Sequence, residues 1–340
     1  MAKTLTDVRE ISKLAYGFMA SRALFAALEL RLFGHIAAGA RDLAALSAAT
    51  GVPQHRIATL VAALTSVGAL VREEGSLVNS PAVATYLDPA AHAYFGDYYR
   101  LQIGRQIYRD MMRLDAGLAG DRAALAHEEM SGWLADPEEA RTFSDAQHAG
   151  SMGPALMLAK RLDLSGVRSL LDVAGGTGAY SIAFRRANPG LSAAILDFPA
   201  VIEVARGYVE RAGLADSIAL IPGDARQADW PGGHDVVFMS YLLSAVRGDD
   251  IPPLLQRARG ALRPGGKLIV HDFMLDETRS GPSSAALFFL SYLSSNPDAV
   301  SFTAADVARW MEAAGFVDST EEIMIPDITM MVTATRSERP

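Results

Sequence analysis

The sequence contains no cysteine, which excludes disulfide bonds, thiolate metal sites and a cysteine nucleophile. It also lacks long apolar runs, because Arg or Glu interrupts each one before the roughly 18 residues that a membrane-spanning helix needs. Basic residues are few, with 31 Lys and Arg against 39 Asp and Glu, and the net charge of −8 disfavours nucleic acid as a partner. Residues 1–7 show no signal peptide, so the expected location is cytoplasmic.

Apolar residues are plentiful: they make up 50% of the 340 residues, a length that fits about two domains. Residues 7–166 have an almost wholly helical pattern. Within it, residues 43–66 form two short helices joined by a glycine turn, and residues 68–79 a small hairpin, which together predict a winged helix. The second helix offers few basic residues for DNA, so a winged-helix regulator is the weaker interpretation.

From Val167 onward, short strand-like runs alternate with helical segments of about a dozen residues. The predicted strands are 169–173, 193–196, 218–221, 236–239 and 267–271, and the segments 319–325 and 329–335 can pair as an antiparallel edge. This alternation predicts an α/β fold with a mostly parallel sheet. The predicted organisation is a helical winged-helix domain at 1–110, connecting helices at 111–166 and a ligand-binding α/β domain at 167–340.

A glycine-rich loop follows the first predicted strand, with Gly175, Gly176 and Gly178 placed where a ligand must approach the backbone closely. Asp197 ends the second strand, where a carboxylate can accept the hydroxyls of a ribose. Asp224 ends the third strand, where an acid can face an adenine amine. The loop matches neither the dinucleotide pattern nor a P-loop, so the three features together favour an adenosine ligand without a pyrophosphate.

Four segments carry a more specific resemblance: Leu171-Asp-Val-Ala-Gly-Gly-Thr-Gly, Leu196-Asp-Phe-Pro, Gly223-Asp, and Leu262-Arg-Pro-Gly-Gly-Lys-Leu-Ile-Val-His-Asp. They resemble the S-adenosylmethionine (SAM) site of class I methyltransferases, in the small-molecule O-methyltransferase family with an N-terminal winged-helix dimerisation domain. The resemblance implies a Rossmann-like domain with a seven-stranded sheet, SAM as cofactor, S-adenosylhomocysteine (SAH) as product, and a homodimer. The cofactor-binding residues that it implies are Asp172, Gly175, Gly176, Gly178, Asp197, Phe198, Gly223, Asp224, Ala225 and Ser240.

The general base of that family is missing here. Members usually have a histidine after the fourth strand that takes the proton of the acceptor hydroxyl, and Ser244 stands at this position. Three residues are candidates for a catalytic role: His148, Ser244 and His271. No cluster of histidines and carboxylates has the spacing of a metal site, so no metal is expected.

A methyltransferase without a base can act on an acceptor that loses no proton, such as a thioether. The sequence resembles bacterial methylthiohydroxybutyrate S-methyltransferases of dimethylsulfoniopropionate (DMSP) synthesis, which implies S-methylation of 4-methylthio-2-hydroxybutyrate. In this interpretation, tyrosines face a sulfonium product, and Arg105, a histidine or a tyrosine binds a carboxylate. The predicted substrate-binding residues are Tyr98, Tyr99, Gln102, Arg105, Gln106, Gln147, His148, Tyr241, Ser244 and Tyr292.

Three other interpretations remain open at this stage. One is an O-methyltransferase of a phenolic or hydroxylated metabolite, with another residue as the base. Another is a C-methyltransferase of a bacteriochlorophyllide-like pigment, since that group also lacks the histidine. The third is a SAM-binding relative that has lost methyl transfer. All of them imply a small-molecule substrate, with neither nucleic acid nor a membrane as a partner.

Overall fold

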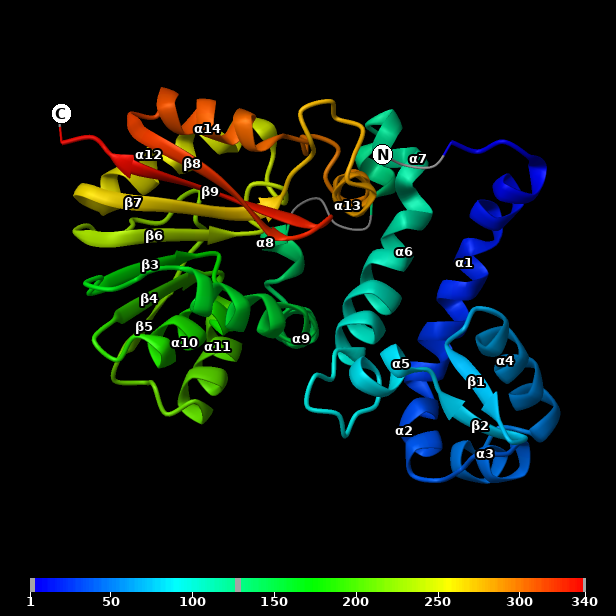
Figure 1. Ribbon diagram of the computed structural model, residues 1–340. Helices are drawn as coiled ribbons and strands as arrows, with labels where there is room; N and C mark the ends of the chain where they lie inside the picture. Colours follow the sequence, from blue (N-terminus) through cyan, green and yellow to red (C-terminus); the bar gives the residue numbers. More distant parts are fainter. Residues whose placement is uncertain (1–3, 126–129, 339–340) are drawn as a thin grey trace. The chain divides into compact units, whose positions relative to one another are not determined.

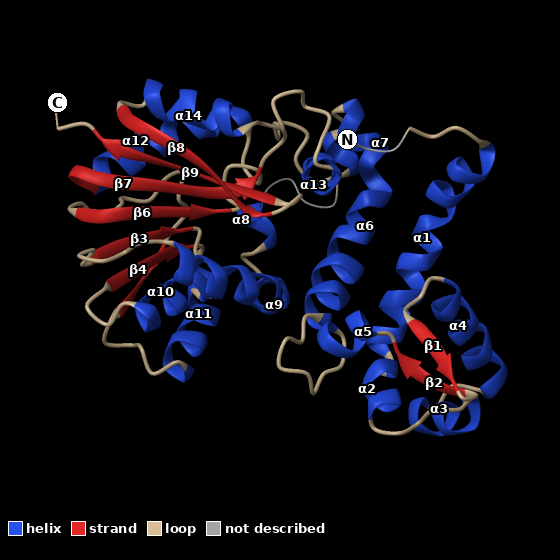
Figure 2. Ribbon diagram, in the orientation of Figure 1, coloured by secondary structure: helices blue, strands red, loops and turns tan. Residues whose placement is uncertain are grey.

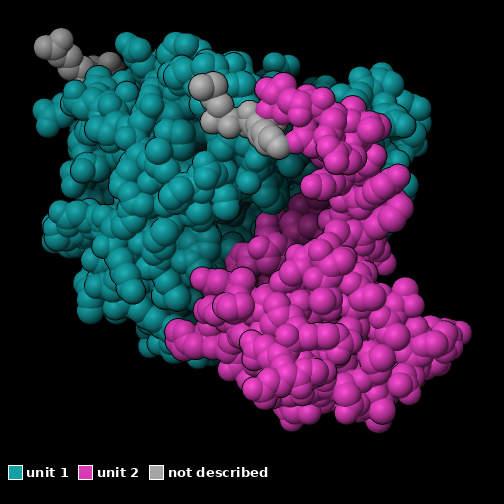
Figure 3. Space-filling view, turned by 45° about the vertical axis from the view of Figure 1, so that its right-hand side comes forward, with its two compact units in different colours: residues 1–2, 109–340 teal, residues 3–108 magenta. Residues whose placement is uncertain are grey.

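The computed structural model describes residues 4–125 and 130–338 (Figure 1). The described chain divides into two compact units, an N-terminal unit of residues 4–108 and a C-terminal unit that begins at residue 109 (Figure 3). The residues predicted as separate connecting helices, 111–166, group with the C-terminal unit. None of the helices in the described ranges is long and apolar enough to cross a membrane.

The N-terminal unit is a winged helix preceded by a long helix. Its elements are α1 (Val8–Glu29), α2 (Leu32–Ala37), α3 (Leu43–Thr50), α4 (Gln54–Ser66), β1 (Leu70–Glu73), β2 (Ser76–Asn79), α5 (Pro81–Tyr86) and the π-helical η1 (Tyr98–Ile107). Asp7 caps α1 by accepting hydrogen bonds from the backbone of Arg9 and Glu10. Gly51, with φ of 70°, ends α3 and makes the turn into α4. The predicted order of two helices and a hairpin is confirmed.

The C-terminal unit begins with short helices and one long helix, α9. These elements are α6 (Tyr108–Asp110), η2 (Met111–Arg113), α7 (Leu114–Ala119), η3 (Arg122–Ala124), α8 (Met130–Trp133) and α9 (Pro137–Arg161). Asp136 caps α9 through the backbone of Glu138 and Glu139, and Pro137 occupies its first position, where no backbone donor is needed. Helix α9 packs against α10 and α11, which flank the sheet.

A seven-stranded sheet forms the centre of this unit (Figure 2). Its strands are β3 (Ser169–Val173), β4 (Ser192–Asp197), β5 (Ile218–Pro222), β6 (His234–Ser240), β7 (Leu262–Phe273), β8 (Phe316–Ile325) and β9 (Thr329–Arg336). The helices between them are α10 (Ala179–Ala187), α11 (Pro199–Arg211), η4 (Gly248–Asp250), α12 (Ile251–Ala261), α13 (Ser283–Leu293) and α14 (Ala304–Ala313). The order is β5-β4-β3-β6-β7-β9-β8, with β3 to β7 parallel, so the predicted parallel sheet is confirmed.

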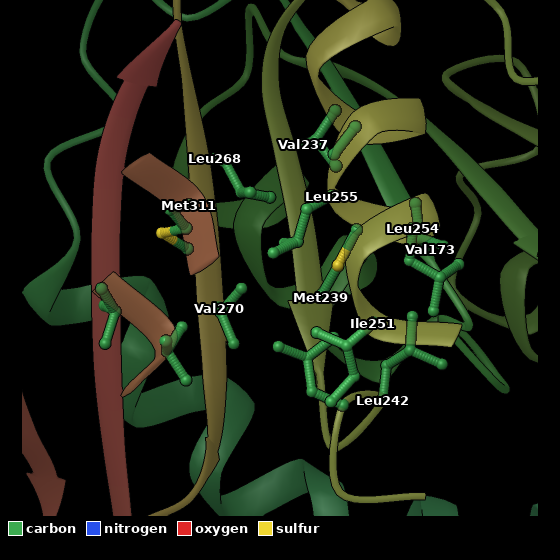
Figure 4. Close-up of a cluster of buried hydrophobic side chains, with 14 of the residues drawn as sticks. Val173, Val237, Met239, Leu242, Ile251, Leu254, Leu255, Leu268, Val270 and Met311 are labelled. Atoms are coloured by element: carbon green, nitrogen blue, oxygen red, sulfur yellow. The ribbon is translucent and has the colours of Figure 1, made fainter. Parts of the chain in front are cut away.

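Side chains of the central strands alternate between the two faces of the sheet. On β6, Val237 and Met239 belong to a core with α12 and α14, whereas Val236 and Phe238 belong to a core with α9, α10 and α11. Figure 4 shows the first core, in which Val237 and Met239 lie near Leu255 of α12. Both faces of the sheet are therefore buried, as a parallel sheet requires.

The last two strands pair antiparallel, as the sequence predicts, but only one of them is an edge strand. Strand β9 lies between β7 and β8, and pairs with both. Val332 and Ala334 of β9 are fully buried or nearly so, whereas most residues of β8 are exposed. The predicted antiparallel pair is therefore confirmed at one end of the sheet, with β8 as the edge strand and β9 beside β7.

Candidate active site

The glycine loop connects β3 to α10 in a conformation that excludes larger residues. Gly178, at the N-terminus of α10, has φ of 78°, and a Cβ there would overlap Cδ1 of Ile195 on β4. A Cβ on Gly175 would lie 2.7 Å from Cγ of Asp172. Side chains of the chain itself therefore exclude larger residues at positions 175 and 178, and the close approach of a ligand to this loop stays a prediction.

Asp172 is a buried carboxyl group with one unused oxygen. Its Oδ2 accepts a hydrogen bond of 2.7 Å from the Ser181 hydroxyl, and its Oδ1 has no hydrogen-bond partner among the described residues. Burial raises the pKa of Asp172 to about 7. A buried acceptor without a partner is costly, so this oxygen suits a ligand that brings a donor, such as the amino group of SAM.

Asp197 connects the glycine loop to the end of β4. Its Oδ2 accepts from the backbone N–H of Gly176 at 2.7 Å, and its Oδ1 accepts from that of Phe198, also at 2.7 Å. Burial raises the pKa of Asp197 to about 6. Each carboxylate oxygen has a further lone pair that could accept a ribose hydroxyl, and that contact stays a prediction.

Asp224, predicted to face adenine, has a partner that the sequence reasoning missed. The Arg226 guanidinium donates to both of its oxygens, and the shortest contact joins Nη2 and Oδ2 at 2.7 Å. Burial opposes ionisation, but the Arg226 hydrogen bonds hold the pKa of Asp224 below its ordinary value. The sequence Asp-Ala-Arg could have predicted this ion pair, because two residues that are two positions apart can meet in a turn after a strand.

All ten predicted cofactor residues lie at or just beyond the carboxyl ends of β3, β4, β5 and β6. These strands are neighbours in the sheet, so the fold brings the residues together at one edge. The Gly223 N–H donates to the carbonyl oxygen of Asp197 at 2.8 Å, and the Ala225 carbonyl accepts from the Trp230 indole at 3.0 Å. Ligands of open α/β sheets bind at this edge, and the residues present fit SAM.

Ser244 lies in the loop after β6 and contacts a buried carboxyl group. Its hydroxyl donates to Oδ1 of Asp272 at 2.6 Å, and its backbone N–H donates to Oδ2 at 3.1 Å. Both residues are fully buried, and burial raises the pKa of Asp272 to about 7. The sequence reasoning missed Asp272, although it directly follows a predicted strand.

His271, a predicted catalytic candidate, is a structural residue of the sheet. Nδ1 lies 2.9 Å from the Ser240 hydroxyl and Nε2 lies 2.9 Å from that of Thr329. The side chain is fully buried, which lowers its pKa to about 3 and keeps it neutral. With both ring nitrogens engaged, His271 has none left to take a proton from an acceptor.

His148 lies on α9 beside the glycine loop. Its Nδ1 is 2.7 Å from the Thr177 hydroxyl, and its ring lies over that of Tyr208 with 3.9 Å between the centroids. Burial lowers the pKa of His148 to about 4. The next residue toward the N-terminus, Gln147, is half-buried. The structure thus places His148 against the cofactor loop, as a neutral side chain.

The other predicted acceptor contacts fall in two places. Tyr241 belongs to the C-terminal unit and packs on His271 and Phe273. The remaining five lie on η1 of the N-terminal unit: Tyr98, Tyr99, Gln102, Arg105 and Gln106. Arg105 was predicted to bind an acceptor carboxylate, but its guanidinium pairs with both oxygens of Glu29 on α1, at 2.7 and 2.8 Å.

Two protein-family models match the chain, the O-methyltransferase dimerisation domain over residues 12–88 and the O-methyltransferase domain over residues 127–317. The tetracenomycin polyketide synthesis 8-O-methyl transferase TcmO of Streptomyces glaucescens is 30% identical over 94% of each chain. The 3-hydroxy-5-methyl-1-naphthoate 3-O-methyltransferase of Streptomyces sahachiroi is 28% identical over 90% of this chain and 88% of its own. Human N-acetylserotonin methyltransferase in complex with SAM shares the fold, with a TM-score of 0.86 and 23% identity over 99% of this chain and 100% of its own.

Proposed function

Because the chain belongs to the O-methyltransferase family with an N-terminal dimerisation domain, and is a SAM-dependent methyltransferase, we propose that its acceptor is a hydroxyl group on a small aromatic molecule. Two similar proteins support this choice, since their names describe O-methylation in polyketide synthesis and of a hydroxynaphthoate. The dimerisation domain supports a homodimer. A cytoplasmic location stays a prediction.

SAM supplies a methyl group that its sulfonium centre makes electrophilic. Asp172 would bind the amino group through its unpartnered Oδ1, and Asp197 would bind the ribose hydroxyls. The loop from Gly175 to Gly178 would hold the methionine portion, because the missing side chains let backbone donors come close. These residues hold SAM, the methyl donor, in one position. They would therefore raise the rate by orienting its methyl group toward the acceptor.

The observation that favours a hydroxyl acceptor is the buried Asp272 beside Ser244. A neutral hydroxyl must lose a proton when it is methylated, and the chain has no histidine at the position where its family usually has one. A carboxyl group with a pKa raised to about 7 can hold a proton at neutral pH.

S-methylation of a thioether acid, the acceptor that the sequence alone favours, is now the second candidate. The serine at position 244 still favours it, because a thioether needs no base. Against it, Arg105, one of the residues that could bind the acceptor carboxylate, is paired with Glu29. The proteins named above are O-methyltransferases, and they lend no support to DMSP synthesis or to a pigment C-methyltransferase.

An acceptor panel with the purified protein tests the proposal. SAH release is measured with SAM and catechol, 3-hydroxy-2-naphthoic acid, N-acetylserotonin or 4-methylthio-2-hydroxybutyrate. We expect turnover with at least one hydroxylated aromatic and none with the thioether, and we expect Asp172→Asn to weaken SAM binding in the same preparation. Turnover with the thioether alone would overturn the hydroxyl acceptor and restore S-methylation.

A further inference from the structure

We infer that His148 is a positioning residue of the cofactor site, which holds the glycine loop in its ligand-binding conformation through the Thr177 hydroxyl. His148 lies on α9, and Thr177 lies in the loop between β3 and α10. The task of His148 would be to order this loop before SAM binds, whichever acceptor receives the methyl group. The inference therefore goes beyond the proposed function, and cofactor binding alone tests it.

The glycine loop is held from two sides. From β4, Oδ2 of Asp197 accepts a hydrogen bond of 2.7 Å from the Gly176 N–H. From α9, Nδ1 of His148 lies 2.7 Å from the hydroxyl of the next loop residue, Thr177. Thr177 is only 3% exposed, and a buried hydroxyl that loses its partner is destabilising. The contact with His148 therefore favours the loop conformation in which Thr177 points toward α9.

The His148 imidazole is in turn held by Tyr208 of α11. The centroids of the two rings are 3.9 Å apart and the ring planes are tilted by 31°, so one ring lies over the other. The Tyr208 hydroxyl donates to Oδ1 of Asp145 at 2.7 Å, and the Arg211 guanidinium lies 4.4 Å from the centre of the Tyr208 ring. Asp145 and His148 are three positions apart on α9, so they share one face of this helix. These contacts fix the orientation of the ring that meets Thr177.

His148 is neutral at physiological pH. Burial lowers its pKa to about 4, while the charge of Asp145 opposes this shift and the charge of Arg211 adds to it. Burial, and next the hydrogen bond to Asp145, raise the pKa of Tyr208, so that side chain is neutral as well. A neutral imidazole has one donor and one acceptor nitrogen, and either can pair with a hydroxyl. We therefore expect the contact with Thr177 to persist between pH 5 and 8.

A loop that is ordered before binding increases the affinity for its ligand. A mobile loop loses conformational entropy when it closes on a ligand, and this loss weakens binding. Thr177 stands between Gly176 and Gly178, and glycine is the residue with the greatest backbone freedom. A side-chain contact at position 177 therefore restricts the most flexible part of the loop.

A direct catalytic role for His148 is the weaker interpretation. Its pKa of about 4 makes the ring a poor acceptor for the proton of a phenol at neutral pH. The contacts that the structure shows for its ring are with Thr177 of the loop and Tyr208 of α11. These are the contacts expected of a residue that acts on the cofactor site through another side chain.

Two substitutions at position 148 separate the hydrogen bond from the ring packing. His148→Phe keeps an aromatic ring over Tyr208 but has no polar atom for Thr177. His148→Asn keeps a polar atom close to the place of Nδ1 but loses the ring. Thr177→Val removes the same hydrogen bond from the loop side with little change in side-chain size. The double variant His148→Phe/Thr177→Val shows whether the two residues act through one contact.

His234 provides a matched control at the opposite edge of the sheet. Its Nδ1 lies 2.6 Å from the Ser169 hydroxyl, which is the same kind of contact between an imidazole and a hydroxyl. His234 begins β6 and Ser169 begins β3. Both therefore lie at the amino ends of their strands, whereas the glycine loop follows the carboxyl end of β3. His234→Phe should bind SAH as the wild type does.

Calorimetry measures the binding of SAH and of 5′-methylthioadenosine, which lacks the amino-acid portion, and thermal unfolding checks that each variant is folded. We expect His148→Phe and Thr177→Val each to weaken SAH binding by about tenfold, the upper range for one hydrogen bond. The double variant should lose no more than either single variant. His148→Asn should stay within about threefold of wild type, because it keeps the hydrogen bond. The affinity for 5′-methylthioadenosine should change by less than about threefold, since the loop is proposed to hold the methionine portion.

Three results would overturn the inference. Normal SAH affinity in a folded His148→Phe would mean that the loop does not need this contact. Additive losses in the double variant would mean that the two residues act separately. Equal losses for SAH and 5′-methylthioadenosine would indicate general damage to the domain. Should His148→Phe not fold, Thr177→Val and His148→Asn still decide the matter, and the acceptor panel tests the hydroxyl acceptor independently of all these outcomes.

Discussion

At the scale of single residues, the site depends on carboxyl groups whose burial makes them weak acids. Asp197 is the clearest case, because it holds the loop N–H of Gly176 and the N–H of Phe198 and still has lone pairs for a ligand. Its pKa is raised to about 6 by burial. Ionised carboxylates accept stronger hydrogen bonds than neutral ones, so ligand affinity should depend on pH through this group.

We predict that the affinity for 5′-methylthioadenosine rises as pH increases through about 6. This ligand has the ribose but no amino acid, so Asp172 does not contribute. Below pH 6 Asp197 is protonated in the folded protein, whereas above pH 6 its carboxylate accepts the ribose hydroxyls. The affinity should therefore rise on the order of tenfold across this range. Calorimetry between pH 5 and 8 measures the affinity for 5′-methylthioadenosine. Asp197→Asn should give a flat profile, and an equally steep profile in that variant would refute the ribose contact.

At the scale of elements, the loop between β3 and α10 needs glycine for two separate reasons. The φ of Gly178 is 78°, which costs energy for any residue with a Cβ, and the Cβ would also overlap Ile195. Gly190, in the turn before β4, has open space around the same position and no positive φ. The two glycines form a matched pair for substitution.

We predict that Gly178→Ala weakens SAH binding by more than about tenfold and destabilises the fold by roughly 1–3 kcal/mol, because the loop must shift. Gly190→Ala should change neither quantity. Denaturant unfolding and calorimetry on the two variants provide the comparison. Normal SAH binding by Gly178→Ala would mean that the loop does not approach the ligand as closely as its geometry indicates.

The sequence predicted the elements better than the contacts between them. The strands were predicted because short β-rich runs alternate with helical segments, and Asp197 and Asp224 were placed at strand ends. The position of β9 inside the sheet depends on pairing with β7, which no local pattern records. The same holds for Asp272, because its contact with Ser244 spans 28 positions and forms only when β6 and β7 align.

At the scale of the whole molecule, α1 exposes an apolar surface that a single chain leaves uncovered. Its exposed apolar residues are Val8, Ile11, Leu14, Tyr16, Phe18 and Met19. Contiguous exposed apolar side chains usually mark an interface, and the dimerisation-domain model matches residues 12–88, which include most of this helix. We therefore expect the homodimer to use α1, although the cofactor residues all belong to the C-terminal unit.

Leu14→Glu should therefore convert the dimer to a monomer without unfolding the protein. Leu14 is 72% exposed, so a charge there costs the isolated chain little, whereas burial of that charge in an interface is expensive. Ile323→Glu, at a 58% exposed position on edge strand β8, is the control and should remain dimeric. Analytical ultracentrifugation gives the mass of each variant, and SAH binding should persist in both. A Leu14→Glu protein that stays dimeric, as Ile323→Glu does, would place the interface elsewhere than the apolar face of α1.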